Sequence, residues 1–269
     1  MKVQNKIVVV TGGGNGMGRE LVLALLSKGA SVAAVDINPS ALEETVKLAG
    51  MNRANLATYT VNITDRAAVE ALPEQVISRF GAVDGIINNA GVIQPFVKLK
   101  DLDYAAIDRV MDVNLFGTLY MIKTFLPHLL ARPEAHITNI SSMGGFLPVP
   151  GQTIYGASKA AVKLLTEGLS SELQGTNVRV TVVFPGAVGT NIAANSGVMD
   201  TLQVKAGEAP PVKMLAPDKA ARIILEGIEN NRYRVLVGSD SKLMDAVYRL
   251  NPQRAARFIL NQMSGLLPQ

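Results

Sequence analysis

Residues 6–18 read KIVVVTGGGNGMG, and this stretch decides the fold. The β-branched run over residues 6–10 predicts a central strand of a parallel sheet. A helical pattern from Leu21 to Leu26, ending at Gly29, predicts a helix. The glycines between them let the backbone approach a pyrophosphate, whose charge meets the helix N-terminus. The stretch therefore predicts a strand, a phosphate-binding turn and a helix, with an ordinary glycine-rich turn as the alternative.

The second predicted strand, residues 31–35, ends in Asp36. An acidic residue at this place hydrogen-bonds the ribose hydroxyls of an adenosine and repels a 2′-phosphate. The residue after Asp36 is Ile37 and not a basic residue, and position 15 is likewise occupied by Asn15 and not by a basic residue. The pattern favours NAD over NADP as the cofactor.

The same alternation continues along the chain. Further strands are predicted at residues 56–61, 83–87, 136–140, 178–184 and 233–237, and helices at residues 39–49, 65–80, 104–130, 152–173 and after Pro217. Thr64 is the expected cap of the 65–80 helix, and Pro73 is expected to kink or restart it. Strands that alternate with helices predict an α/β fold, a Rossmann-type doubly wound parallel sheet with helices on both faces. We expect one catalytic domain over residues 1–240 and a helical extension packed on it over residues 241–269.

A candidate proton-transfer site lies between residues 141 and 159. Tyr155 and Lys159 are four residues apart on a predicted helix and so share one face. A neighbouring ammonium lowers the pKa of a phenol, which makes such a pair suitable for acid–base chemistry near neutral pH. Ser142, at the end of the preceding strand, can offer a hydroxyl to the same substrate oxygen. Taken alone, a Tyr-x-x-x-Lys pair is a weak signal, and two surface side chains are the alternative.

Composition excludes several classes of protein. The chain has 48% hydrophobic and 18% charged residues, so we expect a large core rather than disorder. It has no Cys, and its two histidines, His128 and His136, lack a partner at metal-ligand spacing, so we expect no metal site. The net charge is +4, but residues 231–269 carry six basic and two acidic side chains, which leaves residues 1–230 neutral. Nucleic-acid binding is therefore not expected, and without an apparent targeting or membrane-spanning segment we expect a cytoplasmic protein.

Taken together, the motifs resemble those of the short-chain dehydrogenases/reductases over roughly residues 5–240. The resemblance rests on six motifs in order and at the family's spacing, namely Thr11-Gly12-x-x-x-Gly16-x-Gly18, Asn88-Asn89-Ala90-Gly91, Asn114, Ser142, Tyr155-x-x-x-Lys159 and Pro185-Gly186. It implies that Tyr155 is the general acid/base and that Lys159 lowers its pKa and binds the nicotinamide ribose. It also implies that Ser142, rather than the competing Ser141, stabilises the substrate oxygen, and that Asn114 holds the water of a proton relay to Lys159.

The resemblance further implies an NAD site, in which the segment from Pro185 to Thr190 contacts the nicotinamide. The expected cofactor-binding residues are Gly12, Asn15, Gly16, Met17, Gly18, Asp36, Ile37, Asn62, Ile63, Asn89, Ala90, Gly91, Tyr155, Lys159, Pro185, Gly186, Val188 and Thr190. Asn62 departs from the family's usual Asp, and its amide can still contact adenine. By analogy with the family we expect a homo-oligomer, a dimer or a tetramer.

The substrate should be a small apolar ketone or secondary alcohol. Apolar residues follow both Ser142 and the Asn-Asn-Ala-Gly run, and no Arg or Lys is evident that could clamp a substrate carboxylate or phosphate. These residues are Val92, Ile93, Pro95, Phe96, Met143, Phe146, Leu147, Pro148, Val149 and Pro150. The alternative is that they belong to the core. Residues 188–215 have the composition of a substrate lid.

The basic, apolar tail after residue 240 has two interpretations. Leu243, Met244, Val247 and Tyr248 form one apolar stripe, and Phe258, Ile259, Met263 and Leu266 a looser one. We favour a tail that folds over the body and shapes the substrate entrance, with membrane-surface contact as the less favoured alternative.

The leading hypothesis is an NAD-dependent oxidoreductase that interconverts a secondary alcohol and a ketone. An idle NAD(H)-sensing or scaffold protein on the same fold is a second hypothesis, since a fold does not establish a function. A third is the related epimerase/dehydratase branch, in which the glycine spacing differs.

Overall fold

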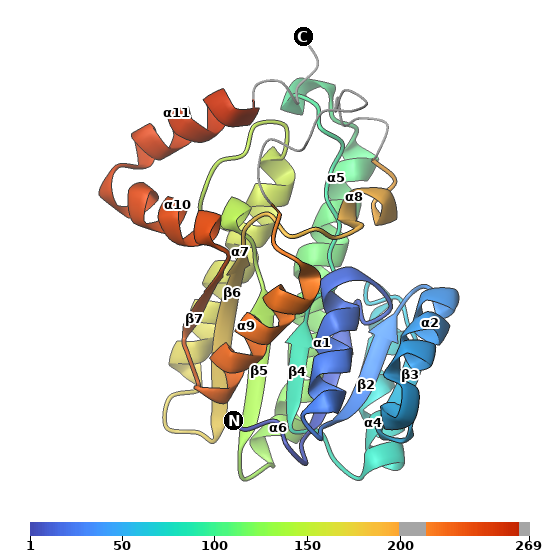
Figure 1. Ribbon diagram of the computed structural model, residues 1–269. Helices are drawn as coiled ribbons and strands as arrows, with labels where there is room; N and C mark the ends of the chain where they lie inside the picture. The colour runs from blue at the N-terminus through green and yellow to red at the C-terminus, as the bar shows by residue number, and fades with distance from the viewer. Residues whose placement is uncertain (199–213, 264–269) are drawn as a thin grey trace.

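The computed structural model describes residues 1–198 and 214–263 (Figure 1). Its centre is a seven-stranded parallel sheet with the strand order β3-β2-β1-β4-β5-β6-β7. The strands are β1 (Ile7–Thr11), β2 (Ser31–Asp36), β3 (Leu56–Thr60), β4 (Gly85–Asn88), β5 (Ala135–Ile140), β6 (Val178–Pro185) and β7 (Arg234–Val237). The predicted fold class is confirmed, and each predicted strand is found with its ends shifted by at most two residues.

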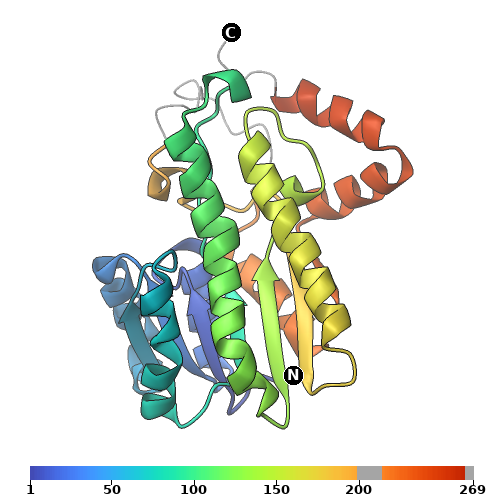
Figure 2. The same cartoon turned by 180° about the vertical axis from the view of Figure 1, so that it is seen from behind.

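Helices cover both faces of the sheet. The longer helices are α1 (Gly16–Ser27), α2 (Pro39–Ala49), α4 (Leu72–Phe80), α5 (Tyr104–Met111), α6 (Thr118–Leu130), α7 (Thr153–Glu172), α9 (Pro217–Glu229), α10 (Ser239–Leu250) and α11 (Pro252–Met263). The shorter ones are η1 (Gly50–Asn55), α3 (Arg66–Glu70), η2 (Leu99–Asp101), the π-helical turn η3 (Asp112–Gly117), η4 (Met143–Gly145) and α8 (Ile192–Asn195). Helices α1, α2 and α9 cover the face seen in Figure 1, and α4, α6 and α7 cover the face seen in Figure 2.

Alternation along β1 shows why this strand is apolar from Ile7 to Val10. Val8 and Val10 pack into the core beneath α1 and α9, whereas Val9 packs into the opposite core beneath α4 and α6. Successive side chains of a strand point to opposite faces. A strand buried on both faces must therefore be apolar at every position, which is what residues 6–10 indicated.

Two of the predicted helices differ in detail. The helix expected over residues 65–80 is divided into α3 and α4, and Pro73 lies in the first turn of α4, so the predicted restart is found. Its cap is Asp65, whose side chain accepts a hydrogen bond from Ala68 N at 3.1 Å, and not Thr64. Thr64 instead donates its hydroxyl to Asn62 Oδ1 at 3.0 Å. The helix expected over residues 104–130 is interrupted by the π turn η3, which contains Asn114.

The C-terminal helices form a hairpin beyond the carboxyl end of β7 (Figure 1). Met244 of α10 and Ile259 of α11 pack against Leu147, which lies just after η4. The predicted stripe on α10 is correct at Met244, Val247 and Tyr248, whereas Leu243 is 60% exposed. Leu266 and most of the expected lid, residues 199–213, lie outside the described residues. No helix in the described part of the chain has the length and hydrophobicity to cross a membrane.

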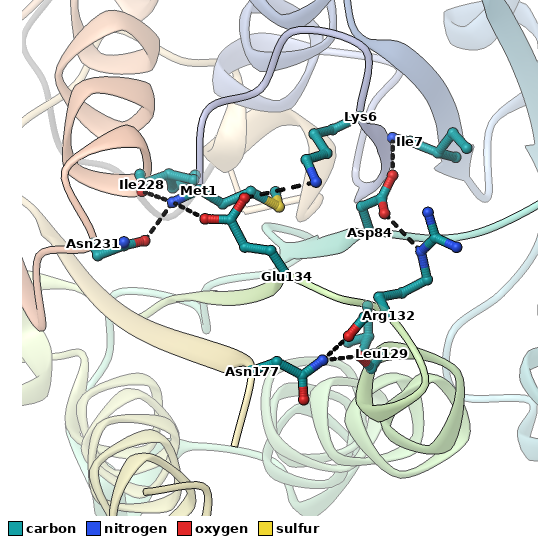
Figure 3. A network of polar contacts seen from close by, with 10 residues as sticks. All are labelled: Met1, Lys6, Ile7, Asp84, Leu129, Arg132, Glu134, Asn177, Ile228 and Asn231. Atoms are coloured by element: carbon teal, nitrogen blue, oxygen red, sulfur yellow. Dashed lines mark hydrogen bonds and ion pairs between the residues drawn. The ribbon is translucent and has the colours of Figure 1, made fainter. Parts of the chain in front are cut away.

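A polar network joins the amino ends of the strands to neighbouring loops (Figure 3). The carboxylate of Asp84 accepts hydrogen bonds from Ile7 N at 2.9 Å and from Arg132 Nε at 2.8 Å. Glu134 lies 3.6 Å from Lys6 Nζ and 3.7 Å from the amino group of Met1. Asp84 is only 1% exposed, so its carboxylate has lost its contacts with water. The hydrogen bonds from Ile7 and Arg132 offset most of this desolvation cost.

We predict that Asp84→Ala lowers the free energy of unfolding by about 2–3 kcal/mol, because it leaves the Ile7 amide and the Arg132 guanidinium without their shared acceptor. Urea denaturation measures the change. The control is Glu70→Ala, which removes a solvent-exposed ion pair with Arg66 and should lower the free energy of unfolding far less. Equal losses in the two variants would contradict the prediction.

Candidate active site

The glycine-rich turn after β1 is too tight for side chains. Gly12 and Gly16 have φ values of 67° and 51°, in the left-handed region that favours glycine. A Cβ at Gly18 would lie 1.9 Å from the carbonyl oxygen of Gly12. Asn15 caps α1 by accepting a hydrogen bond from Gly16 N at 2.7 Å. The glycines therefore leave backbone accessible to a ligand at the N-terminus of α1, where Asn15 and Met17 are the cleft residues that carry side chains.

Asp36 is held in place at the end of β2. One carboxylate oxygen accepts a hydrogen bond from Gly14 N at 2.9 Å, and the other accepts one from Asn38 N at 3.0 Å. A Cβ at Gly14 would lie 2.9 Å from the same carboxylate. The glycine turn thus positions the acidic side chain as well as bringing the backbone close to a ligand.

The segment after β4 is tied to the end of β1. The hydroxyl of Thr11 accepts hydrogen bonds from Asn89 N at 3.0 Å and Ala90 N at 3.1 Å, and Asn89 Nδ2 donates to Thr11 O at 3.0 Å. β1 and β4 are adjacent, although β2 and β3 lie between them in the chain. Such a switch point opens a crevice at the carboxyl ends of the strands. Thr11 fixes the two walls of that crevice.

Asn114 has partners for its whole side-chain amide. Its Oδ1 accepts a hydrogen bond from Val92 N at 2.8 Å, and its Nδ2 donates to Val92 O at 2.9 Å and to Ser158 Oγ at 3.0 Å. The side chain projects from the π turn η3, a distortion that often marks functional sites. Asn114 therefore joins the segment after Gly91 to helix α7.

Tyr155 lies near the start of α7 and close to Ser142, since a Cβ at Gly144 would lie 3.5 Å from both Tyr155 Cε1 and Ser142 Oγ. Burial raises the pKa of Tyr155 above its ordinary value, and the hydrogen bond with Ser142 opposes this shift. Ser142 Oγ also accepts a hydrogen bond from Gly144 N at 3.0 Å. Ser141, the competing serine, instead donates to the backbone oxygen of Lys159 at 2.8 Å and is 2% exposed. The geometry thus pairs Tyr155 with Ser142.

Lys159 is buried one turn after Tyr155. Its Nζ donates a hydrogen bond to Ile140 O at 3.0 Å, and burial lowers its pKa to about 8. The expected lowering of the Tyr155 pKa by Lys159 is not found, because burial of the phenol dominates and Lys159 directs its ammonium to a carbonyl. A Cβ at Gly91 would lie 3.1 Å from both Lys159 Nζ and Asn114 Oδ1, so these two polar atoms converge on one glycine.

One cleft of about 870 Å³ connects these parts. Every residue expected to bind the cofactor lines it, from Gly12 to Thr190, together with Ser142. Asn114 does not line it, because its fully buried side chain lies behind the segment after Gly91.

Other cleft residues had no signal in the sequence. Asp108, Arg109 and Asp112 line the cleft from α5 and η3, as do Asn191 and Asn195 from the region of α8. The cleft therefore contains a basic side chain, Arg109, that the sequence did not indicate. This side chain is already engaged, because Arg109 Nη1 donates a hydrogen bond to Ser196 O at 2.8 Å. These positions belong to no motif, and only the fold brings them to the cleft.

Six of the ten apolar residues expected around the substrate fall into two groups. Val92 and Ile93 line the cleft. Met143, Phe146, Leu147 and Val149 instead pack against α10 and α11, where Phe146 also contacts the rings of Phe184 and Tyr248. For this second group the core interpretation is correct, because the C-terminal hairpin covers these side chains.

The comparisons with known proteins agree with this geometry. A family model for short chain dehydrogenases matches residues 6–200. The chain belongs to the short-chain dehydrogenase/reductase family. A putative oxidoreductase of this kind from Mycobacterium tuberculosis, SadH, is 34% identical over 270 residues, which cover 98% of each protein. The 3-oxoacyl-(acyl-carrier-protein) reductase FabG of Thermotoga maritima is 32% identical over 84% of this chain and 91% of its own.

Solved structures of the family have the same fold. A short-chain dehydrogenase/reductase from Burkholderia phymatum in complex with NAD superposes with a TM-score of 0.83 at 28% identity, covering 94% of this chain and 95% of its own. One from Burkholderia cenocepacia in complex with NADP gives a TM-score of 0.79 at 28% identity, covering 97% and 99%.

The two histidines stand apart from this short-chain dehydrogenase site. His136 is 2% exposed, and its Nε2 is 2.8 Å from Thr181 Oγ1 in the sheet. Burial lowers its pKa to about 3. His128 lies in the last turn of α6. The described residues contain no group of three acidic, His or Cys side chains that could hold a metal ion.

We predict that His136 makes the fold sensitive to acid. Its pKa is near 6.5 in the unfolded chain but about 3 when folded, so between these values the unfolded state binds the extra proton and stability falls as the pH falls. From pH 6.5 to pH 5 the wild type should lose about 2 kcal/mol more free energy of unfolding than His136→Gln. Urea titrations of both proteins at each pH measure this, and parallel pH profiles would refute it.

Proposed function

We propose that this short-chain dehydrogenase is an NAD-dependent oxidoreductase that interconverts a secondary alcohol and a ketone. The observation that carries the proposal is that Tyr155 and Ser142 approach each other in the same cleft that the glycine turn lines, where a Cβ at Gly144 would lie 3.5 Å from both Ser142 Oγ and Tyr155 Cε1. A phenol beside a hydroxyl can pass a proton to or from a substrate oxygen.

The cleft suits a dinucleotide. Its turn has glycine where a Cβ would clash with neighbouring protein atoms, and the N-terminus of α1 can receive a pyrophosphate. Gly12 to Gly18 would hold the pyrophosphate, Asp36 the adenosine ribose, Asn89 to Gly91 the adenosine side, and Lys159 the nicotinamide ribose. The bound nicotinamide supplies hydride transfer. Structures of two related proteins in complex with NAD and with NADP support a nicotinamide cofactor.

The preference for NAD rests on Asp36. Its carboxylate lines the cleft and is fixed by two backbone amides, so it cannot easily swing away from a 2′-phosphate. Two like charges about 4–5 Å apart at a partly buried site repel by several kcal/mol. The ribose hydroxyls of NAD can instead donate hydrogen bonds to the same oxygens.

Tyr155 is the proposed acid/base. Its raised pKa keeps the phenol protonated at neutral pH, which is the form that protonates a developing alkoxide during reduction. Ser142 stabilises the same oxygen by hydrogen bonding. In the reverse direction the phenolate accepts the proton of the alcohol. Asn114 is the proposed relay residue, and any water that it holds must share an amide already bonded to Val92 and Ser158.

The proposed substrate is a small apolar ketone or alcohol, because Val92 and Ile93 line the cleft and Arg109 is engaged by Ser196. We further propose a cytoplasmic homo-oligomer, by analogy with the family. The competing proposal is an NAD(H) sensor on the same fold, for which the Tyr155–Ser142 pair would have no purpose.

We predict that the purified protein oxidises NADH with apolar ketones and that Tyr155→Phe lowers kcat at least ~100-fold, because the proton donor is lost. Absorbance at 340 nm follows the reaction. The control is Tyr104→Phe, at a residue that is 84% exposed on α5 and should leave kcat unchanged. NADH binding without turnover of any ketone would favour the sensor, and full activity of Tyr155→Phe would refute the acid/base role.

We predict that Asp36→Asn shifts the ratio of NADPH to NADH affinity by about 100-fold toward NADPH. The amide keeps an acceptor for Gly14 N but removes the charge that repels a 2′-phosphate. Calorimetric titration with both cofactors measures the ratio. Asp112→Asn removes the same charge elsewhere in the cleft and should shift the ratio less than threefold. A wild-type preference for NADPH would overturn the assignment of Asp36.

A further inference from the structure

The first turn of α10 lies against the segment that follows β6 (Figure 1). Asp240, the second residue of α10, accepts a hydrogen bond through Oδ2 from Ala187 N at 2.6 Å. Ala187 O in turn accepts one from Leu215 N at 2.8 Å. Both backbone polar groups of Ala187 therefore have partners, and the carboxylate that holds its amide comes from the first turn of α10.

The carboxylate of Asp240 also fills the space beside two glycines. A Cβ at Gly186 would lie 2.2 Å from Asp240 Oδ2, and a Cβ at Gly238 would lie 2.3 Å from Asp240 Oδ1. Contacts this short do not occur between real atoms, so the carboxylate needs glycine at both places. Asp240 makes no ion pair with any described residue, and it is the Ala187 amide that holds one of its oxygens.

Ser241 Oγ anchors α10 to β6 by donating a hydrogen bond to Phe184 O at 2.8 Å. The segment itself is tied to β7, where Gly186 N donates to Val237 O at 2.9 Å. With α10 fixed in this way, Asp240 is the side chain that holds the Ala187 amide in place.

The segment that Asp240 holds is a wall of the cleft. Pro185, Gly186, Val188 and Thr190 all line it. At its far end Thr190 lies over the glycine turn, because a Cβ at Gly16 would be 3.3 Å from Thr190 Cβ. Moving Ala187 would therefore move the wall that stands between β6 and the glycine turn.

We propose that Asp240 is a positioning residue that holds the Gly186–Ala187 backbone against the nicotinamide half of the bound cofactor. The inference rests on the proposed NAD site, and it gives the start of α10 a part in cofactor binding that no motif of the sequence indicated. Asp240 does not touch the cofactor in this proposal, since it does not line the cleft.

Two ligands distinguish binding at the nicotinamide half of the site from binding at the adenosine half. NADH carries the nicotinamide, whereas ADP-ribose lacks it and depends on the glycine turn and Asp36. By isothermal titration calorimetry, Asp240→Ala and Asp240→Ser should raise the Kd for NADH at least tenfold and change the Kd for ADP-ribose less than threefold. The serine variant keeps a residue suited to the start of a helix if the alanine variant folds poorly. Asp240→Asn, which retains an acceptor for Ala187 N, should bind NADH within threefold of the wild type.

The matched control is Asp245→Ala on the same helix. Asp245 pairs with Arg234 and Arg249 and not with the cleft segment, so its loss should leave both affinities unchanged. An equal weakening of both ligands by the Asp240 variants would indicate a general loss of structure and overturn the proposal, as would unchanged NADH affinity. A wild-type protein that binds neither ligand would instead refute the NAD site itself.

Discussion

The hydrogen bonds between Thr11 and the backbone of Asn89 and Ala90 are the constraint on which the site depends. Parallel strands all end at the same edge of a sheet, but they form a crevice only where the connections diverge to either side. Here that divergence lies between β1 and β4. A threonine hydroxyl with two lone pairs can accept both backbone amides at once, and so it fixes the width of the crevice.

A chain of contacts leads from Thr11 to Lys159 and Tyr155. Asn89 and Ala90 lead to Gly91, where Lys159 Nζ and Asn114 Oδ1 approach the same backbone. Asn114 then holds Val92 and Ser158, and Ser158 belongs to the helix that carries Tyr155. The cleft wall and helix α7 are thus parts of one hydrogen-bonded unit, which limits how far Tyr155 can move relative to a ligand.

Burial sets the protonation behaviour of this unit. Tyr155 has a raised pKa and Lys159 a lowered one, both because the interior disfavours the charged form. The two shifts bring the phenol and the ammonium toward their neutral forms together. A phenol that remains protonated and a lysine that titrates near pH 8 are suited to moving one proton between neighbours.

The sequence by itself determined the fold class and the motif residues that line the cleft. Strands apolar on both faces and a turn that tolerates no Cβ are local properties, and parallel strands bring their carboxyl ends to one edge without further information. For that reason the sequence pattern, together with the family resemblance of its motifs, assigned Gly12, Asp36, Gly91, Tyr155 and Pro185 to one cleft. Only the tertiary structure decided which apolar residues after Ser142 are core, because the covering helices α10 and α11 are about 100 residues away in the chain. It also decided the pKa of Tyr155 and the bond from Asp240 to Ala187, since burial and long-range hydrogen bonds arise only when distant segments pack together.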